Sequence, residues 1–340
     1  MTRFLVICTY LGALPKYFNL FAHSCGFVPE IDFLVLTDAT PKDYSLPPNL
    51  KIQRLTTEEF QSRTQHALGI SGPIPSGYKL NDYKPMYGEI FSDLIAGYDY
   101  WGSGDIDLIF SPRLTDFLMA GAAENADIIN TSVLWLHGPL TLFKNSQSMC
   151  TLYQKSRHWK NVVESSAHFA FDECGTKYAY LDREVGFPSE TDPHNRSYLD
   201  ISPEDLLNFQ DFDCMSTVVI RERNAGRCRI FQEFVFKGYI WPGEKVLVKD
   251  GEILAENNSW CAYHWYSEKR RRKFSYPSWR TVPKTFYIDQ YGFFDARTPW
   301  LNRWLHGLAF SQGVLRLLHD RVLYHLGQIG LGRRPTRPFE

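Results

Sequence analysis

The sequence predicts an α/β fold with a mixed, mainly parallel sheet flanked by helices, and three observations support this prediction. Short apolar runs rich in β-branched residues alternate with segments of helical spacing through the first half of the chain. A capping-box sequence begins one of those helical segments. The 340 residues are 44% hydrophobic and 15% aromatic, which is enough apolar material for a large buried core.

The first half begins as β-α-β, with strands predicted at residues 4–10 and 31–38 around a helical segment. A third strand is predicted at 51–55, followed by a helix that starts at the capping box Thr56-Thr57-Glu58-Glu59. Apolar residues between Tyr83 and Ile95 recur at three- and four-residue intervals, which predicts an amphipathic helix.

Further along, the pattern predicts a helix around 113–122 and a strand at 127–132. Strand-like runs then cover 214–221, 229–236 and 245–256, and Asp-Gly within the last run favours a hairpin, so we expect an antiparallel annex. The predicted domains are listed here: a catalytic domain over 1–268, with a donor half (1–135) and an acceptor half (136–268), a basic and proline-containing linker (269–285), and a C-terminal helical extension (286–340).

Charge and cysteine content exclude several classes of protein. The 37 basic and 38 acidic residues give a net charge of −1, which is not the balance of a nucleic-acid binder. Seven cysteines without C-x-x-C spacing argue against a disulfide framework and a zinc ribbon. Neither a signal peptide nor a membrane span is indicated, so we expect a cytoplasmic protein. Arginines around the apolar stripe of 300–326 predict either peripheral contact with the inner face of the membrane or packing on the catalytic domain or on a partner chain.

The candidate metal ligands are Asp105 and Asp107, which lie between a glycine-rich turn and an apolar run. Two carboxylates beside a buried strand are costly to desolvate unless a positive charge compensates them, and a divalent metal with a diphosphate does so. Both carboxylates can reach one ion only if the strand turns between them, which Gly102 and Gly104 permit. The alternative is a pair of turn aspartates without a ligand.

Two further segments have the composition of a binding pocket. Trp135 offers a flat apolar face, His137 a hydrogen-bonding group, and Gly138 close approach of the backbone. Downstream, Asp172 and Glu173 follow an aromatic segment and are candidates for binding acceptor hydroxyls or for acting as a base. The alternatives are a loop held by one aromatic anchor and a turn with solvated carboxylates.

The β-α-β start, the segment Lys79-Leu80-Asn81-Asp82-Tyr83-Lys84 and Gly104-Asp105-Ile106-Asp107 together resemble the glycosyltransferases of the GT-A fold, which use nucleotide-sugar donors. The resemblance covers about residues 3–270. It is strongest to an uncharacterised bacterial family often found with polysaccharide-synthesis genes, and more distant to retaining galactosyl- and mannosyltransferases. It implies transfer of a sugar, with Mn²⁺ or Mg²⁺ as cofactor, from a nucleotide-sugar donor, UDP-linked by preference, to a glycan or lipid-linked acceptor in polysaccharide biosynthesis.

The resemblance also implies roles for individual residues. Asp105 and Asp107 are expected to hold the metal, and His264 to complete its shell, although the glycine spacing usual after that histidine is absent. The remaining donor contacts implied are Thr9, Tyr10, Asp38, Lys79 and Asp82. Each has a structural alternative: a strand end for Thr9 and Tyr10, a cap for Asp38 and Asp82, a surface charge for Lys79 and a core position for His264.

The sequence leaves the stereochemical outcome open. Retention would let the leaving diphosphate take the acceptor proton, whereas inversion would need Asp172 or Glu173 as the base. Two other classes of function also remain: a non-catalytic nucleotide-sugar-binding scaffold, and a two-carboxylate glycoside hydrolase, which the close spacing of Asp105 and Asp107 disfavours.

Overall fold

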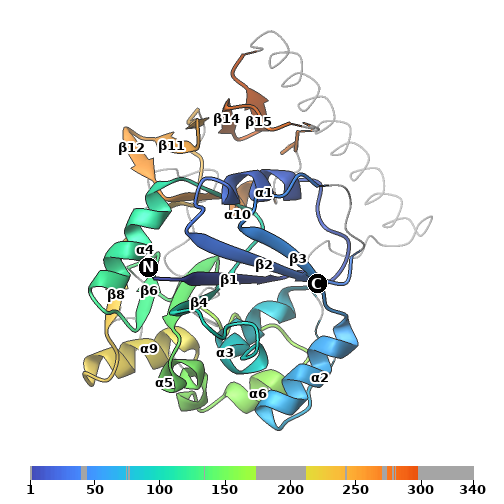
Figure 1. Ribbon diagram of the computed structural model, residues 1–340, viewed down its shortest axis with the longest axis vertical. Coiled ribbons are helices and arrows are strands. Elements are labelled where there is room, and N and C mark those ends of the chain that lie inside the picture. The colour runs from blue at the N-terminus through green and yellow to red at the C-terminus, as the bar shows by residue number, and fades with distance from the viewer. Residues whose placement is uncertain are drawn as a thin grey trace, which may run out of the picture. The chain divides into compact units, whose positions relative to one another are not determined.

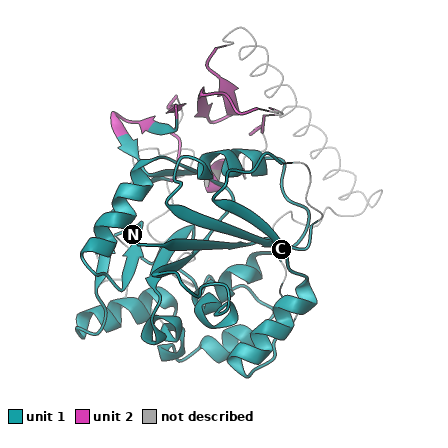
Figure 2. Ribbon diagram, viewed as in Figure 1, with its two compact units in different colours: residues 1–237, 251–253, 259–264 teal, residues 238–250, 254–258, 265–340 magenta. Residues whose placement is uncertain are grey.

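The computed structural model describes residues 2–39, 44–73, 75, 77–133, 135–173, 212–241, 243–269, 274–277, 279 and 281–297. The chain divides into two compact units (Figure 2). The first unit contains residues 1–237, 251–253 and 259–264, and the second contains residues 238–250, 254–258 and 265–340. Every candidate site residue named above belongs to the first unit.

The first unit is built on a seven-stranded sheet of order β3-β2-β1-β4-β7-β6-β8 (Figure 1). Its strands are β1 (Phe4–Thr9), β2 (Ile31–Thr37), β3 (Leu50–Arg54), β4 (Tyr100–Gly104), β6 (Ile128–Asn130), β7 (Leu140–Lys144) and β8 (Ile230–Gln232). Strand β7 runs antiparallel to β4 and β6, and the other pairs are parallel. The predicted mixed, mainly parallel sheet is therefore confirmed.

Helices cover both faces of this sheet, because alternate residues of a strand point to opposite sides. Phe4 and Val6 pack into one core with α1 (Phe18–Cys25) and α4 (Arg113–Ala123). Leu5 and Ile7 pack into the other core. The helices of that second face are α2 (Thr57–Leu68), the 3₁₀ helix η1 (Gly77–Met86), α3 (Tyr87–Ile90), α5 (Gln147–Cys150), η2 (Leu152–Lys155), α6 (Trp159–Glu164) and α9 (Met215–Asn224).

The predicted capping box at the start of α2 is present. Thr56 accepts the backbone N–H of Glu59, and the Glu59 carboxylate accepts the backbone N–H of Thr56. This reciprocal pair satisfies two donors that the first turn of a helix leaves without a partner.

A three-stranded sheet of order β5-β13-β9 adjoins the candidate site within the first unit. It consists of β5 (Leu108–Phe110), β13 (Ala262–His264) and β9 (Phe236–Lys237), with β13 antiparallel to β5 and parallel to β9. A segment far along the chain is thereby paired with the strand that follows Asp107.

A five-stranded sheet has the order β12-β11-β10-β14-β15; β10, β14 and β15 belong to the second unit, and the residues of β11 and β12 are divided between the two units. The strands are β10 (Val246–Lys249), β11 (Glu252–Ala255), β12 (Asn258–Trp260), β14 (Thr285–Asp289) and β15 (Gly292–Asp295), and a short helix, α10 (Tyr266–Lys269), follows β13. Asp250 and Gly251 join β10 to β11 with φ of 48° and 89°, which confirms the predicted Asp-Gly turn.

The structure corrects the secondary structure predicted for two segments. Residues 214–221 were expected to form a strand but lie mainly in helix α9, where Met215, Val218 and Val219 are buried at helical spacing. The helix expected from Tyr83 to Ile95 is instead a 3₁₀ helix followed by the four-residue α3. Pro85 lacks the N–H that a continuous α-helix would need.

The annex also differs from the prediction. Strand β8 extends the central sheet parallel to β6, and β9 pairs parallel to β13, so only part of the annex is antiparallel. The basic cluster 270–273 and the helices expected from Trp300 onward lie outside the described residues. In the part of the chain that the structure describes, no helix is long and apolar enough to cross a membrane.

Candidate active site

Asp105 and Asp107 occupy the turn between β4 and β5, where the sequence predicts a change of direction. The Asp105 N–H donates to the carbonyl of Pro139 at 3.0 Å, which fixes the start of the turn. Gly104 is required before it, because a Cβ there would lie 2.7 Å from Cγ1 of Val6 and 3.2 Å from Sγ of Cys8. The tight packing of β4 on β1 thus sets where the carboxylates stand.

His264 is brought to the same place by strand pairing. In the antiparallel ladder of β13 and β5, His264 lies opposite Leu108, the residue after Asp107. Its Nε2 is 3.4 Å from Oδ2 of Asp107, and Asp105, Asp107 and His264 each offer one ligand atom within 4.8 Å of the others. Two carboxylates and an imidazole form a donor set that suits Mn²⁺ or Mg²⁺, so these residues fit the metal that the resemblance implies.

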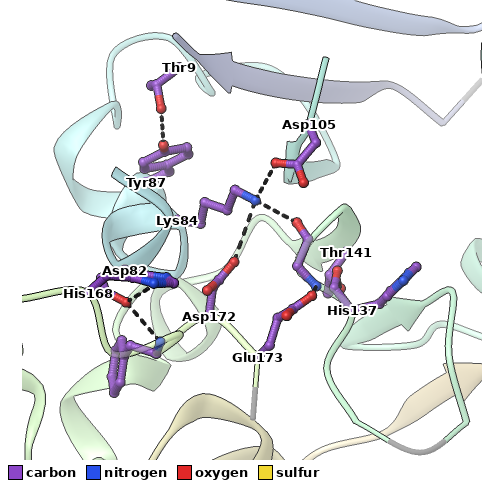
Figure 3. A network of polar contacts seen from close by, with 12 residues as sticks. Thr9, Asp82, Lys84, Tyr87, Asp105, His137, Thr141, His168, Asp172 and Glu173 are labelled. Carbon is purple, nitrogen blue, oxygen red and sulfur yellow. Dashed lines mark hydrogen bonds and ion pairs between the residues drawn. The ribbon is translucent and has the colours of Figure 1, made fainter. Parts of the chain in front are cut away.

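Lys84 connects the three candidate metal ligands to the adjacent acids Asp172 and Glu173, which we call the acid pair. The sequence did not identify Lys84 as a site residue. Its ammonium donates to Oδ1 of Asp105 at 2.7 Å and to the carbonyl of Gly138 at 2.8 Å, and lies 3.5 Å from Oδ2 of Asp172 (Figure 3). Burial lowers the pKa of Lys84, but the carboxylates of Asp105 and Asp172 outweigh it and raise the pKa overall. The lysine is therefore charged and links two carboxylates across the site.

Asp172 and Glu173 are held against the backbone of Gly138. The Gly138 N–H donates to Oε1 of Glu173 at 2.9 Å, and a Cβ at Gly138 would lie 2.6 Å from that oxygen and from Oδ2 of Asp172. Burial raises the pKa of Asp172 and of Glu173, while the positive charge of Lys84 opposes the rise. The two predicted pocket segments thus meet, through Lys84, at the Asp105 carboxylate.

We expect Gly138→Ala to displace the acid pair. The added methyl group overpacks the site, which costs about 1–3 kcal/mol in a well-packed interior. Urea denaturation should show the lower free energy of unfolding, and an activity assay should show that any catalytic activity is lost. Gly238→Ala is the matched control, because a Cβ there meets nothing within 4 Å. Equal behaviour of the two variants would contradict the packing described for Gly138.

His137 is a neutral hydrogen-bonding group. Burial, aided by His264 and Lys84, lowers the pKa of His137 to about 3. Its Nδ1 is 2.6 Å from the Thr131 hydroxyl, which donates its single hydrogen to the carbonyl of Leu140 at 2.8 Å. The imidazole therefore donates from Nδ1, which leaves Nε2 as an acceptor.

Lys79 and Asp82, two of the donor contacts that the resemblance implies, are both buried and form an ion pair with each other. The Lys79 side chain is 3% exposed, and its ammonium donates to Oδ2 of Asp82 at 3.1 Å and to the carbonyls of Val162 (2.5 Å) and Ala167 (2.9 Å). Three acceptors saturate its three N–H groups, so it is not available to a phosphate.

Asp82 instead fixes the turn that carries the acid pair. Its carboxylate accepts the backbone N–H groups of Phe169 (3.0 Å) and Phe171 (2.9 Å), on either side of Ala170. Ala170 has φ of 49°, a left-handed conformation that a non-glycine residue adopts only when its surroundings hold it. Asp82 therefore holds the backbone turn that precedes Asp172.

The remaining predicted donor residues lie at the carboxyl ends of β1 and β2. The Thr9 hydroxyl is hydrogen-bonded to the Tyr87 hydroxyl, and the Tyr10 N–H donates to the carbonyl of Leu36 at 2.8 Å. Oδ1 of Asp38 accepts the Gly12 N–H at 2.5 Å.

Comparison with known proteins places most of the chain in a family. A family model described as a family of unknown function (DUF6625) matches residues 6–296. Among curated proteins, none matches the sequence.

Two solved structures are similar over about half of the chain. The crystal structure of S. aureus TarS 1-349 has 13% identity and a TM-score of 0.27, covering 45% of this chain. The chain thus spans about half (48%) of that structure. Mouse xyloside xylosyltransferase 1, in its apo form, has 8% identity and a TM-score of 0.29, covering 48% of this chain and 72% of its own. TM-scores this low assign neither fold nor function.

Proposed function

The chain belongs to the family of unknown function DUF6625, whose description names no activity. From the chemistry of its site, we propose that the protein is a metal-dependent glycosyltransferase. It would move a sugar from a nucleoside diphosphate to a glycan or lipid-linked acceptor. The observation that carries this proposal is the convergence of Asp105, Asp107 and His264 with Lys84 and the acid pair. The resemblance to GT-A enzymes supports the same assignment.

The donor half of the reaction is assigned to the carboxyl ends of the central strands, where open α/β sheets usually bind ligands. Asp105, Asp107 and His264 would hold Mn²⁺ or Mg²⁺, which supplies positive charge to a leaving diphosphate. Thr9, Tyr10 and Asp38 are at the right ends of β1 and β2 to contact the nucleoside, with UDP preferred. Lys84, rather than Lys79, is the cation that contacts the proposed metal ligand Asp105.

The acceptor half is assigned to Asp172, Glu173 and His137. In the reaction, an acceptor hydroxyl oxygen bonds to the anomeric carbon while the bond from that carbon to the diphosphate breaks. Resemblance to retaining enzymes favours a route in which the diphosphate takes the hydroxyl proton on the same face. In an inverting route, Asp172 or Glu173 would take that proton, and the anomeric configuration of the product distinguishes the two.

If transfer needs an ionised Asp172 or Glu173, the rate of transfer should fall at acidic pH as that carboxylate becomes protonated. A raised carboxyl pKa means that the ionised form is lost as the pH falls through that raised value. Activity that needs an ionised Asp172 or Glu173 therefore falls at a pH above the ordinary pKa of that side chain, 3.8 for aspartate and 4.5 for glutamate. Rate profiles of the wild type and of Glu173→Gln test this, with Lys84 and Asp105 as the charged neighbours. An acidic limb that is unchanged in Glu173→Gln and in Asp172→Asn would exclude both carboxyls as its source.

A donor screen tests the proposal itself. The purified protein is incubated with a panel of nucleotide sugars, with Mn²⁺ or with EDTA, and release of the nucleoside diphosphate is measured. Metal-dependent release from one donor, increased by an added acceptor, is the expected result. Tight metal-dependent nucleotide binding without release would favour a non-catalytic scaffold. Cleavage of a glycoside without any nucleotide would favour a hydrolase.

A further inference from the structure

An exposed aromatic pair stands beside the acid pair in the first unit. The rings of Tyr78 and His168 have centroids 5.9 Å apart and planes inclined by 33°. Tyr78 is 50% exposed, and of the large apolar side chains that the structure describes only Phe234 is more exposed. The His168 side chain is 37% exposed. The two partly exposed rings offer flat apolar faces to a ligand.

The pair lies next to groups assigned to the chemistry. An imidazole nitrogen of His168 and carboxylate oxygens of Asp82 and Asp172 lie within 4.8 Å of one another. Tyr78 belongs to η1, the same element that contributes Asp82 and Lys84. The His168 ring thus lies next to the Asp172 carboxylate, whose side chain is 7% exposed.

The backbone under His168 is held on both sides, which gives the ring a fixed position. The preceding residue, Ala167, is tied by its carbonyl to the Lys79 ammonium at 2.9 Å. The following residue, Phe169, donates its N–H to the buried Asp82 carboxylate at 3.0 Å. Nε2 of His168 also lies 3.8 Å from Oδ1 of Asp82 (Figure 3). Such preorganisation lowers the entropy that a binding site loses when a ligand arrives.

The charges around the pair favour an uncharged ligand. Burial lowers the pKa of His168, which leaves the imidazole neutral, although Asp82 opposes the shift. The carboxyls of Asp172 and Glu173 follow along the same segment and disfavour a phosphate group. A sugar ring fits these conditions, because it has an apolar face for aromatic stacking and a rim of hydroxyls for hydrogen bonds.

We propose that Tyr78 and His168 form the acceptor subsite, in which the apolar face of an acceptor sugar stacks on the ring pair and one of its hydroxyls points toward Asp172. The assignment rests on the proposed transferase function and specifies where the acceptor binds. It applies to the sugar of a free glycan and of a lipid-linked one.

The test separates acceptor binding from donor chemistry. With the donor that the screen identifies, transfer to methyl glycosides of glucose, galactose, mannose and N-acetylglucosamine is measured beside hydrolysis of the donor by water. Tyr78→Ala and His168→Ala should each raise the KM for the acceptor roughly three- to tenfold, the usual effect of losing an aromatic contact. Hydrolysis of the donor should stay within about twofold of the wild type, because no donor contact is removed.

Two control variants sharpen the result. Tyr78→Phe keeps the ring and should keep the wild-type KM. Phe234→Ala removes a ring of similar exposure, 52%, that packs on Trp260, and should also leave the KM unchanged. An unchanged KM in both alanine variants of the ring pair, or an equal loss of hydrolysis and transfer, would overturn the subsite.

Saturation-transfer NMR with the same methyl glycosides tests the subsite without a donor. The expected result is a signal from the wild type that Tyr78→Ala abolishes. A wild type that binds a glycoside through Tyr78 but releases no nucleoside diphosphate would count against the transferase proposal alone. Signals equal in the wild type and in Tyr78→Ala would count against the subsite alone.

Discussion

Asp105→Asn and Asp107→Asn should each abolish metal-dependent binding of the nucleoside diphosphate while the protein stays folded. Each substitution keeps the side-chain volume but removes the negative charge that a divalent cation requires. Loss of a partner outside the ligand shell typically weakens metal affinity about 10- to 100-fold, and loss of a ligand should exceed that. Calorimetric titration of UDP, with Mn²⁺ and with EDTA, measures the effect.

A surface aspartate provides the matched control for these variants. Asp93 is 57% exposed at its side chain and pairs with Arg63 at 2.8 Å, so Asp93→Asn should leave nucleotide binding unchanged. Circular dichroism of all three variants checks that each is folded. If both Asp105→Asn and Asp107→Asn bind UDP and Mn²⁺ with wild-type affinity, the proposed metal site is wrong.

Asp82→Ala should destabilise the protein strongly and abolish sugar transfer. The substitution leaves the buried Lys79 ammonium without its ion-pair partner, and it removes the acceptor for the N–H groups of Phe169 and Phe171. Removing one partner of a buried ion pair costs about 3–5 kcal/mol. Urea denaturation measures the free energy of unfolding. The donor and acceptor assays measure sugar transfer, which we expect to be lost when Asp172 is displaced.

A double variant separates stability from positioning. Lys79→Met combined with Asp82→Ala leaves no buried charge without a partner, so it should recover part of the stability lost in Asp82→Ala. It should not recover transfer, because the backbone around Ala170 still has no acceptor to hold the turn. Recovery of transfer together with stability would show that Asp82 has no positioning role.

The sequence predicted the fold correctly in segments whose apolar spacing is compatible with only one type of secondary structure. The strands at 4–9 and 31–37 are short apolar runs, and the capping box of α2 is a local pairing of Thr56 with Glu59. The β-branched run 217–220 was ambiguous, because burial on one face of a helix and burial in a strand give the same composition over so few residues. Only the tertiary position of α9 decides between them.

The sequence allowed us to predict which residues belong to the site, but not which of them contact one another. Carboxylates beside glycines indicated Asp105 and Asp107, yet the pairing of His264 with them depends on a strand ladder between distant segments. Lys79 and Lys84 lie five positions apart on one 3₁₀ helix, and the sequence carried no signal for which one faces Asp105. Gly138 was expected to permit close approach, and the group that approaches it is the acid pair.

Thermal denaturation of the wild-type protein with nucleoside diphosphates, each with Mn²⁺ and with EDTA, tests the central claim most directly. A ligand at about 100 times its Kd adds roughly 2.7 kcal/mol to the stability of the native state, which raises the Tm by several degrees. The account predicts such a rise for one nucleoside diphosphate with Mn²⁺, and its loss with EDTA. If folded protein shows no rise in Tm with any nucleotide and Mn²⁺, the claim of a metal-dependent nucleotide-sugar site is contradicted.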